Sequence, residues 1–167
     1  YDGALSDLMH VIDKGGVTRR VQYYISQIYY ESGQFNNSLM AINKALAIDS
    51  KYAAGYAWRA KVLAKTNKVQ AALEDFGKAI KFAKYKKERY YFYKARYLKS
   101  RGEVEKSIQL LEECLLNNKK YIPGLLLMAE IYRSQNQRNL SNDYLNRVLA
   151  IQPQNRLALK IMGRSEN

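Results

Sequence analysis

The sequence predicts an all-α protein, a solenoid in which antiparallel helix pairs are stacked one after another. Three observations predict it: a period of 34 or 35 residues, a turn residue at a fixed place in each period, and apolar pairs at helical spacing. A repeat of this length is one supersecondary unit that buries its apolar face against its neighbours. The chain has 167 residues, with only two Pro and nine Gly, so irregular structure should be scarce.

A turn between two helices recurs once in each period. Gly and Asn tolerate the left-handed backbone conformation that ends a helix, and the sequence places them at spacings of 34, 35 and 34. The extra residue of the middle spacing falls in the basic linker around residues 84–87. The turn residues are Gly33, Asn67, Gly102 and Asn136.

Small residues mark the places where two helices approach closely, because a long side chain would hold the helix axes apart. One series lies on the first helix of each unit and a second series on the second helix, with the same period. Bulky i and i+4 pairs give each second helix one apolar stripe. The first series is Ser26, Ala60, Ala95, Ala129 and Gly163, the second is Ala45, Ala79, Cys114 and Val148, and the pairs are Ile42/Leu46, Phe76/Ile80, Leu111/Leu115 and Leu145/Leu149.

These series divide the chain into helix–turn–helix units, and we expect residues 1–167 to form a single domain of such units. The fourth unit departs from the others where its second helix begins, because Arg138 and Asn142 stand at positions that are apolar elsewhere. That helix is expected to start loosely or to face something polar. The full units are residues 19–52, 53–86, 88–121 and 122–155.

Both ends of the chain fit partial units. Residues 1–18 fit the second helix of a preceding unit, since Ala4, Leu8 and Val11 keep the period of 34. Residues 156–167 fit a terminal half unit or cap, but they are apolar where an end cap usually presents a polar face. We infer a piece of a longer superhelix or an end that docks on something, with a well-packed cap as the alternative. The apolar residues are Leu157, Leu159, Ile161 and Met162.

The pattern resembles the tetratricopeptide repeat family, whose period is about 34 residues. The second unit, AAGYAWRAKVLAKTNKVQAALEDFGKAIKFAKYK, carries the resemblance, and Pro153 after VLAIQ matches the family's closing proline. The resemblance covers nearly the whole chain and implies a right-handed superhelical solenoid of antiparallel helix pairs. It also implies a scaffold for protein–protein interaction. The matching positions of the second unit are Tyr56, Ala60, Leu63, Ala72, Phe76 and Ala79.

The first helix of each unit lines the concave wall in this family, so the resemblance implies that partners bind there. In the third unit, the stretch ERYYFYKARYLKSRGE interleaves rings with basic groups. Some of its rings fall at packing positions, while others share a face with cations at i, i+3, i+4, i+7 and i+10. That face holds Arg89, Phe92, Tyr93, Arg96 and Lys99.

Carrying this register to the other units predicts a basic, aromatic groove. Tyr, Trp and Arg most often dominate interface energies, and such a wall suits a partner segment with carboxylates and apolar anchors. Packing of these rings in the core is the alternative. The family's carboxylate clamp for chaperone tails fits neither possible frame, so that kind of adaptor is not expected. The candidate partner-binding residues are Arg20, Tyr23, Tyr24, Gln27, Trp58, Lys61, Lys65, Arg89, Phe92, Tyr93, Arg96, Lys99 and Arg133.

A basic excess also points to the partner. The net charge is +13, and nine basic residues lie between Lys81 and Arg101 against Glu88 alone. A clustered excess favours an acidic protein, a nucleic acid or a membrane surface, with a plain solvated face as the alternative. No apolar run approaches the roughly 20 residues of a membrane span, so no span is expected.

Catalysis is not expected from these residues. His10 is the only histidine, Cys114 occupies a small-residue position that should be buried and inert, and neighbouring Glu112 and Glu113 point about 100° apart on a helix. There is no Gly-rich phosphate loop and no metal-ligand spacing, so no cofactor or metal is predicted. A single cysteine is compatible with a reducing compartment and favours the cytoplasm only slightly, while export stays open.

Binding of single-stranded nucleic acid by the same surface is the alternative function, since cations neutralise phosphates and rings stack on bases. A code of one base per repeat would need matched polar side chains in every unit. The predicted groove floor is mixed and includes an acid, which disfavours such a code. Self-association through the apolar repeat ends is a secondary hypothesis. The floor residues are Gln27, Lys61, Arg96, Glu130 and Arg164.

Overall fold

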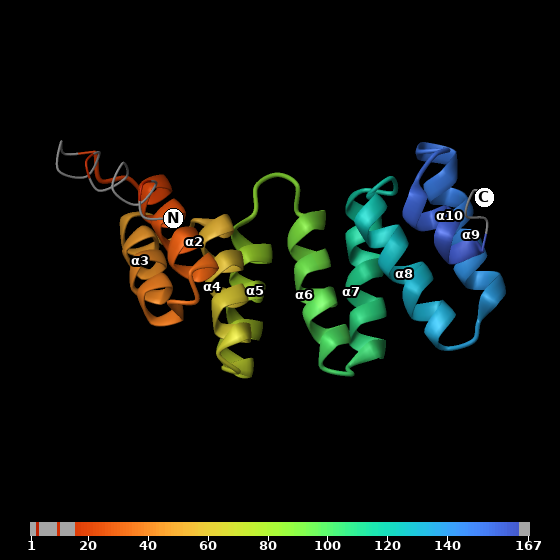
Figure 1. Ribbon diagram of the computed structural model, residues 1–167, viewed down its shortest axis with the longest axis horizontal. Coiled ribbons are helices and arrows are strands. Elements are labelled where there is room, and N and C mark those ends of the chain that lie inside the picture. The colour runs from red at the N-terminus through yellow and green to blue at the C-terminus, as the bar shows by residue number, and fades with distance from the viewer. Residues whose placement is uncertain (1–2, 4–9, 11–15, 164–167) are drawn as a thin grey trace. The chain divides into compact units, whose positions relative to one another are not determined.

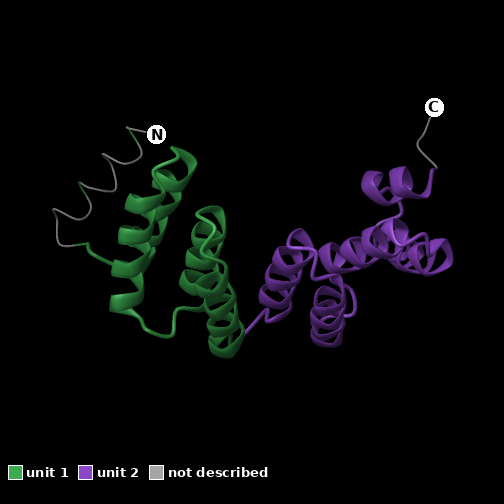
Figure 2. Ribbon diagram, turned by 90° about the horizontal axis from the view of Figure 1, so that it is seen from below, with its two compact units in different colours: residues 1–84 green, residues 85–167 purple. Residues whose placement is uncertain are grey.

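A computed structural model describes residues 3, 10 and 16–163 of the chain. Within that part every regular element is an α-helix and no strand occurs, so the predicted all-α class is confirmed. Short turns join the helices into antiparallel pairs (Figure 1). The chain divides into two compact units, residues 1–84 and 85–167, which are described separately (Figure 2). None of the described helices is long and apolar enough to cross a membrane.

Unit 1 contains two helix pairs. Helices α2 (Arg19–Glu31) and α3 (Phe35–Ile48) form the first pair, and α4 (Ala53–Lys65) and α5 (Val69–Phe82) form the second. Because α3 also packs against α4, the two pairs share one core. The predicted half unit at residues 1–18 lies outside the described residues, apart from its last three positions and residues 3 and 10.

Unit 2 contains two further pairs and one short helix. Contacts run within each pair, from α7 to α8, and from α9 to α10, so its core is continuous from α6 onward. The reading of residues 1–167 as one domain stays a prediction. The helices are α6 (Glu88–Ser100), α7 (Val104–Asn117), α8 (Ile122–Ser134), α9 (Arg138–Ile151) and α10 (Arg156–Met162).

The predicted turns are confirmed. Gly33, Asn67, Gly102 and Asn136 have φ angles of 77°, 58°, 80° and 61°, each in the turn that joins the first helix of a pair to the second. The next amide then donates to a carbonyl near the end of the first helix, as Glu103 does to Leu98 at 3.0 Å. These bonds satisfy carbonyl groups that a helix end leaves open.

The small residues lie in the core as predicted, with one exception. Those of both series from Ser26 to Val148 are fully buried, which confirms close helix approach at these positions. The packing role expected for Gly163 is wrong, because this residue is exposed and ends α10 with a φ of 75°. Glycine adopts that angle without steric cost, so it stops the helix instead of packing.

A serine on the second helix joins three of the four pairs at their closest approach. Each serine is buried and donates its hydroxyl to the carbonyl of the small residue that lies 12 positions earlier. Ala72 takes this place in the α4–α5 pair. The bonds run from Ser38 to Ser26 O at 2.8 Å, from Ser107 to Ala95 O at 2.8 Å, and from Ser141 to Ala129 O at 2.9 Å.

The α4–α5 pair is joined by a buried ion pair. Asp75 is 2% exposed and accepts from Arg59 Nε at 2.6 Å and from Nη2 at 2.8 Å. Arg59 Nη1 also donates to Asn43 Oδ1 of α3 at 2.7 Å. The bond to Asp75 raises the pKa of Arg59, which therefore stays charged. Three helices of unit 1 are tied together through this guanidinium.

The loose start expected for the last second helix is not seen. Helix α9 begins at Arg138 and is 14 residues long, which is also the length of α3, α5 and α7. Arg138 is exposed and Asn142 is half-buried, so these polar residues lie at the surface. Ser141 between them holds the helix to its partner through its bond to Ala129 O.

Candidate partner-binding surface

Three candidate residues of α2 and α4 contact one another in unit 1, together with Tyr30 of α2, which is not among the candidates. Trp58 packs edge to face on Tyr23 and Tyr30, with ring centroids 5.7 Å and 5.3 Å apart. Lys61 Nζ lies 4.3 Å from the centroid of Tyr30 and 4.4 Å from that of Trp58. Such ring pairs and cation–ring contacts each contribute roughly 0.5–1.5 kcal/mol. These four residues, here called the unit 1 cluster, form one continuous surface of rings and charge.

A buried hydrogen-bond chain fixes the orientation of Trp58. Its indole Nε1 donates to Ser26 Oγ at 2.9 Å. The Ser26 hydroxyl lies 2.8 Å from Ser38 O and 2.9 Å from Ser38 Oγ, and Ser38 Oγ donates to Ser26 O. Ser26 is the only polar member of the first small-residue series, since alanine stands at the equivalent place of the other pairs.

The other candidates of unit 1 lie around this cluster. Gln27 donates to the hydroxyl of Tyr23 at 3.3 Å. Tyr24 is 50% exposed and packs edge to face on Tyr23 at 5.8 Å. Arg20 and Lys65 are exposed on α2 and α4, and the contacts above do not include them.

In unit 2, candidates of α6 form a second surface. Arg89 Nη2 donates to the hydroxyl of Tyr93 at 3.1 Å, and the guanidinium of Arg96 lies 5.7 Å from the ring centroid of Phe92. Phe92 also packs on Tyr93 at 5.9 Å and on Tyr121, which precedes α8, at 5.7 Å. These five residues are the unit 2 cluster.

The electrostatics of the unit 2 cluster keep it positive. Burial, together with Tyr93, raises the pKa of Tyr121 to about 12, and the hydrogen bond from Arg89 to Tyr93 raises the pKa of Arg89. The phenol of Tyr121 is therefore neutral at ordinary pH and the guanidinium is charged. At Tyr121 the surface therefore presents no phenolate that would offset the guanidinium of Arg89.

The remaining candidates of unit 2 are not part of the cluster. Lys99 forms an ion pair with Glu130 of α8, and Arg133 is exposed on the same helix. Arg164, the last member of the predicted groove floor, lies outside the described residues. Gln27 and Lys61 belong to unit 1, and Arg96 and Glu130 to unit 2, so the ladder through all of them stays a prediction.

Two tyrosines that precede helices were missed as site residues. Tyr52 packs on Tyr23 at 5.8 Å and lies under the guanidinium of Arg19 at 5.0 Å, while Tyr121 packs on Phe92. Each tyrosine is followed three residues later by a glycine, at which a Cβ would come within 2.6 Å or 3.3 Å of the ring. The pairs Tyr52/Gly55 and Tyr121/Gly124 are 69 residues apart, and that spacing is the signal that would have identified them.

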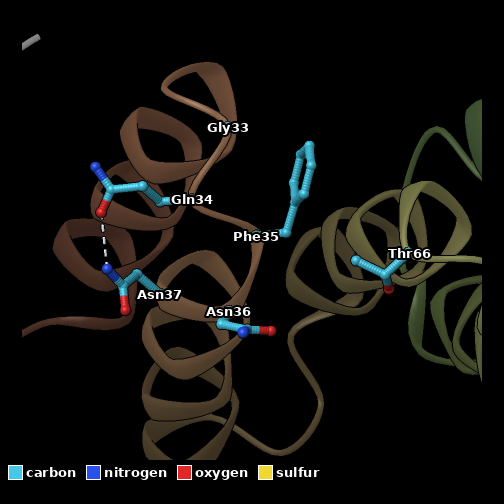
Figure 3. A pocket seen from close by; sticks show the side chains of 6 residues that line it. All are labelled: Gly33, Gln34, Phe35, Asn36, Asn37 and Thr66. Atoms are coloured by element: carbon cyan, nitrogen blue, oxygen red, sulfur yellow. Dashed lines mark hydrogen bonds between the residues drawn. The ribbon is translucent and has the colours of Figure 1, made fainter.

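The groups considered for catalysis lie outside these surfaces. His10 is exposed, and the predicted burial of Cys114 is confirmed, with a pKa that burial raises to about 12. The described residues contain no group of three metal-ligating side chains. A shallow depression of about 420 Å³ lies at the turns of unit 1 beside Phe35 and Thr66, with a hydrogen bond from Asn37 to Gln34 at its rim (Figure 3). It contains no charged side chain and none of the candidates.

Comparison with known proteins identifies the architecture. A family model described as a tetratricopeptide repeat matches residues 20–52, which is one full unit. No curated protein matches the chain in sequence. Solved structures do match: MamA at 18% identity with a TM-score of 0.70, covering 98% of this chain and 89% of MamA. PilF of Pseudomonas aeruginosa matches at 14% identity and a TM-score of 0.74, covering 96% of this chain and 80% of PilF.

A third structure carries the family's name. A thermophilic TPR protein of Thermus thermophilus matches at 17% identity and a TM-score of 0.67, covering 88% of this chain and 84% of that one. At these identities the likeness concerns the fold, which is an all-α helical repeat solenoid. Tetratricopeptide repeats are in general scaffolds that bind partner proteins. Residues 20–52 therefore match a tetratricopeptide repeat, and the chain as a whole shares the helical repeat fold of these neighbours.

Proposed function

We propose that the chain is a non-catalytic scaffold that binds an acidic, partly apolar segment of a partner protein on its first helices. The observation that carries the proposal is that cations lie on aromatic rings in both clusters, as Lys61 does on Trp58 and Arg96 on Phe92. Rings offer contact area at low entropic cost, and the cations attract carboxylates. The net charge of +13 would speed the encounter with an acidic partner.

The packing of the rings favours a protein segment over single-stranded nucleic acid. Base stacking needs an open ring face. In the unit 1 cluster the rings pack edge to face on one another, and Lys61 covers faces of Tyr30 and Trp58. Side chains of a peptide fit between such rings, whereas a planar base would have to displace the cation.

Two observations support a role without catalysis. The thiol of Cys114 is buried, and its raised pKa keeps it protonated at ordinary pH. The clusters contain rings, lysine and arginine but no carboxylate or histidine to act as a general base. A surface of this kind can bind and orient a partner, and it offers no carboxylate or imidazole base.

A capture experiment tests the proposal. The chain and a Lys61→Glu/Arg96→Glu variant are immobilised and exposed to native lysate at two salt concentrations, with and without nuclease. We expect the wild type to retain a defined protein that the variant loses, that nuclease leaves in place, and whose retained segment is acidic. High salt should weaken retention, because exposed charges are screened beyond about 10 Å at 0.1 M salt.

A charge-matched variant controls for the change in net charge. Lys44 and Lys120 are exposed and lie outside both clusters, so Lys44→Glu/Lys120→Glu should still retain the partner. Loss of retention on nuclease treatment would instead assign the surface to nucleic acid. Equal loss in both double variants would show that only net charge matters and would contradict a specific surface.

A further inference from the structure

The two units are built on the same framework, displaced by 69 residues along the chain. Helix α2 begins at Arg19 and α6 at Glu88, while α4 begins at Ala53 and α8 at Ile122. The ring contact between Tyr23 and Tyr52 in unit 1, at 5.8 Å, recurs between Phe92 and Tyr121 in unit 2, at 5.7 Å. Equivalent positions of the two units can therefore be compared directly.

One pair of equivalent positions differs in charge. In unit 2 the pair is Lys99 and Glu130, and the carboxylate of Glu130 neutralises the ammonium of Lys99. In unit 1 the same positions hold Tyr30 and Lys61, and the ammonium lies on rings. The ion pairs of the described part of unit 1 are Arg19–Asp49 and Arg59–Asp75, so the carboxylate that unit 2 supplies for itself has no counterpart at Lys61.

The cation of unit 1 is held in a defined place. Lys61 Nζ lies between Tyr30 and Trp58, and the indole of Trp58 is fixed by its 2.9 Å hydrogen bond to Ser26. Ser26 is itself fully buried and bonded to Ser38. A preorganised cation binds an anion better than a free lysine side chain, because less conformational entropy is lost on binding.

We propose that Lys61 binds a carboxylate of the partner segment, at the place where Glu130 neutralises Lys99 in unit 2, and that Ser26 is a positioning residue acting through Trp58. This inference rests on the proposed function and names the group that unit 1 recognises. The carboxylate forms an ion pair with Lys61, while the rings of Tyr23 and Tyr24 offer contact to an apolar neighbour on the same segment. No bond is made or broken.

The fluorescence of Trp58 tests the inference directly, because it is the only tryptophan of the chain. The probe is the peptide acetyl-Glu-Leu-Glu-Leu-Glu-Leu-amide, compared with the same peptide in which each Glu is replaced by Gln. We expect a saturable change of Trp58 emission with the Glu peptide, and binding weaker by at least about tenfold for the Gln peptide, which lacks all three carboxylates.

Variants of Lys61 test whether its charge binds the peptide. Lys61→Gln should lower the affinity for the Glu peptide by about tenfold. Lys44→Gln makes an equal change of charge on α3 and should leave that affinity unchanged. Tyr30→Lys/Lys61→Glu builds the unit 2 ion pair into unit 1, and should fold normally, as judged by circular dichroism, yet no longer respond to the peptide.

The role of Ser26 has its own readout. Ser26→Ala removes the bond to Trp58 but introduces the residue found in the other pairs, so folding should persist. The substitution should shift the Trp58 emission of the free protein and increase the quenching of Trp58 by acrylamide. It should also lower the affinity for the Glu peptide. Ser107→Ala removes the equivalent buried serine hydroxyl of unit 2 and leaves the bonds of Ser26 to Trp58 and Ser38 in place, so it should do none of these.

The outcomes distinguish the inference from the proposed function. Equal binding of the two peptides, or of wild type and Lys61→Gln, would overturn the inference. If Trp58 does not respond and the immobilised chain still captures an acidic partner, the inference fails and the proposed function stands. If neither the peptide nor an acidic partner binds, both fail.

Discussion

Arg59 and Asp75 form the ion pair on which the second helix pair of unit 1 depends. Removing Asp75 leaves a half-buried guanidinium without its carboxylate, and breaking such a pair costs about 3 kcal/mol. We expect Asp75→Ala to lower the free energy of unfolding in urea by about that amount. The control is Glu130→Ala, which breaks an exposed pair and should cost about 0.5 kcal/mol. Equal losses would show that Asp75 is not a tie between helices.

The buried thiol of Cys114 should make the protein less stable at alkaline pH. The unfolded chain releases the thiol proton above about pH 8.5, whereas burial keeps it on the native protein up to about pH 12. The native state then binds more protons, so stability falls as pH rises through this window. Between pH 7.5 and 9.8 we expect a loss of about 1.5 kcal/mol in urea unfolding.

A matched variant isolates this effect. Ala45 and Ala79 occupy the equivalent place in unit 1, so Cys114→Ala should fold. Between pH 7.5 and 9.8, its free energy of unfolding should fall less than that of the wild type, by the contribution of the thiol. If wild type and variant lose the same free energy over this pH range, the thiol is not the cause.

At the scale of the helix, two glycines should respond oppositely to alanine. Gly102 ends α6 with a φ of 80°, which alanine adopts only with strain, so Gly102→Ala should cost about 1 kcal/mol. Gly77 lies inside α5, and no atom beyond its own helix backbone and chain neighbours comes within 4 Å of the place that a Cβ would take, so Gly77→Ala should gain about 0.5–1 kcal/mol. Thermal unfolding of both variants measures the difference. A gain at Gly102 would contradict the role of the turn.

The helices and turns were predictable because period and backbone conformation are properties of local sequence. The φ angles of Gly33 and Asn136 follow from residue type and spacing alone. The bonds of Ser107 and Ser141 were not predicted, because a serine bonds a carbonyl on another helix only at the right interhelical distance. That distance is a result of packing.

The same limit applies to the candidate surface. Register along a helix brought Trp58 and Lys61 to one face, where the structure has them in contact. It gave no information on Tyr52 and Tyr121, which precede their helices, since the direction of a side chain outside a helix does not follow from helical spacing. The pairing of Arg59 with Asp75 joins two helices, and neither residue breaks the apolar pattern enough to reveal it.

For the whole molecule, the segment between the two units is where we expect a protease to cut first. Tyr85 is 84% exposed among Lys84, Lys86 and Lys87, and Lys86 has a φ of 52°, which is unfavourable for a lysine. Brief digestion with trypsin should therefore make its first cut within residues 16–163 at these lysines. Mass spectrometry of the fragments locates the cut. A first cut at Arg101 or Arg138, beside the helix turns, would contradict this expectation.

A tyrosine ring that packs against a glycine recurs in every second helix pair, at Tyr52 and Tyr121. This recurrence bears on how such a chain could arise by duplication. A chain lengthened by doubling a block of four helices inherits its framework twice, and the joint between the blocks is where an added residue does least harm. The extra residue of this chain falls at that joint. Divergence is then free at positions the framework does not use, so one ancestral position can become Lys61 in one copy and Glu130 in the other. In unit 2 Glu130 pairs with Lys99, whereas in unit 1 Lys61 lies on rings and is the residue that we propose for a partner's carboxylate.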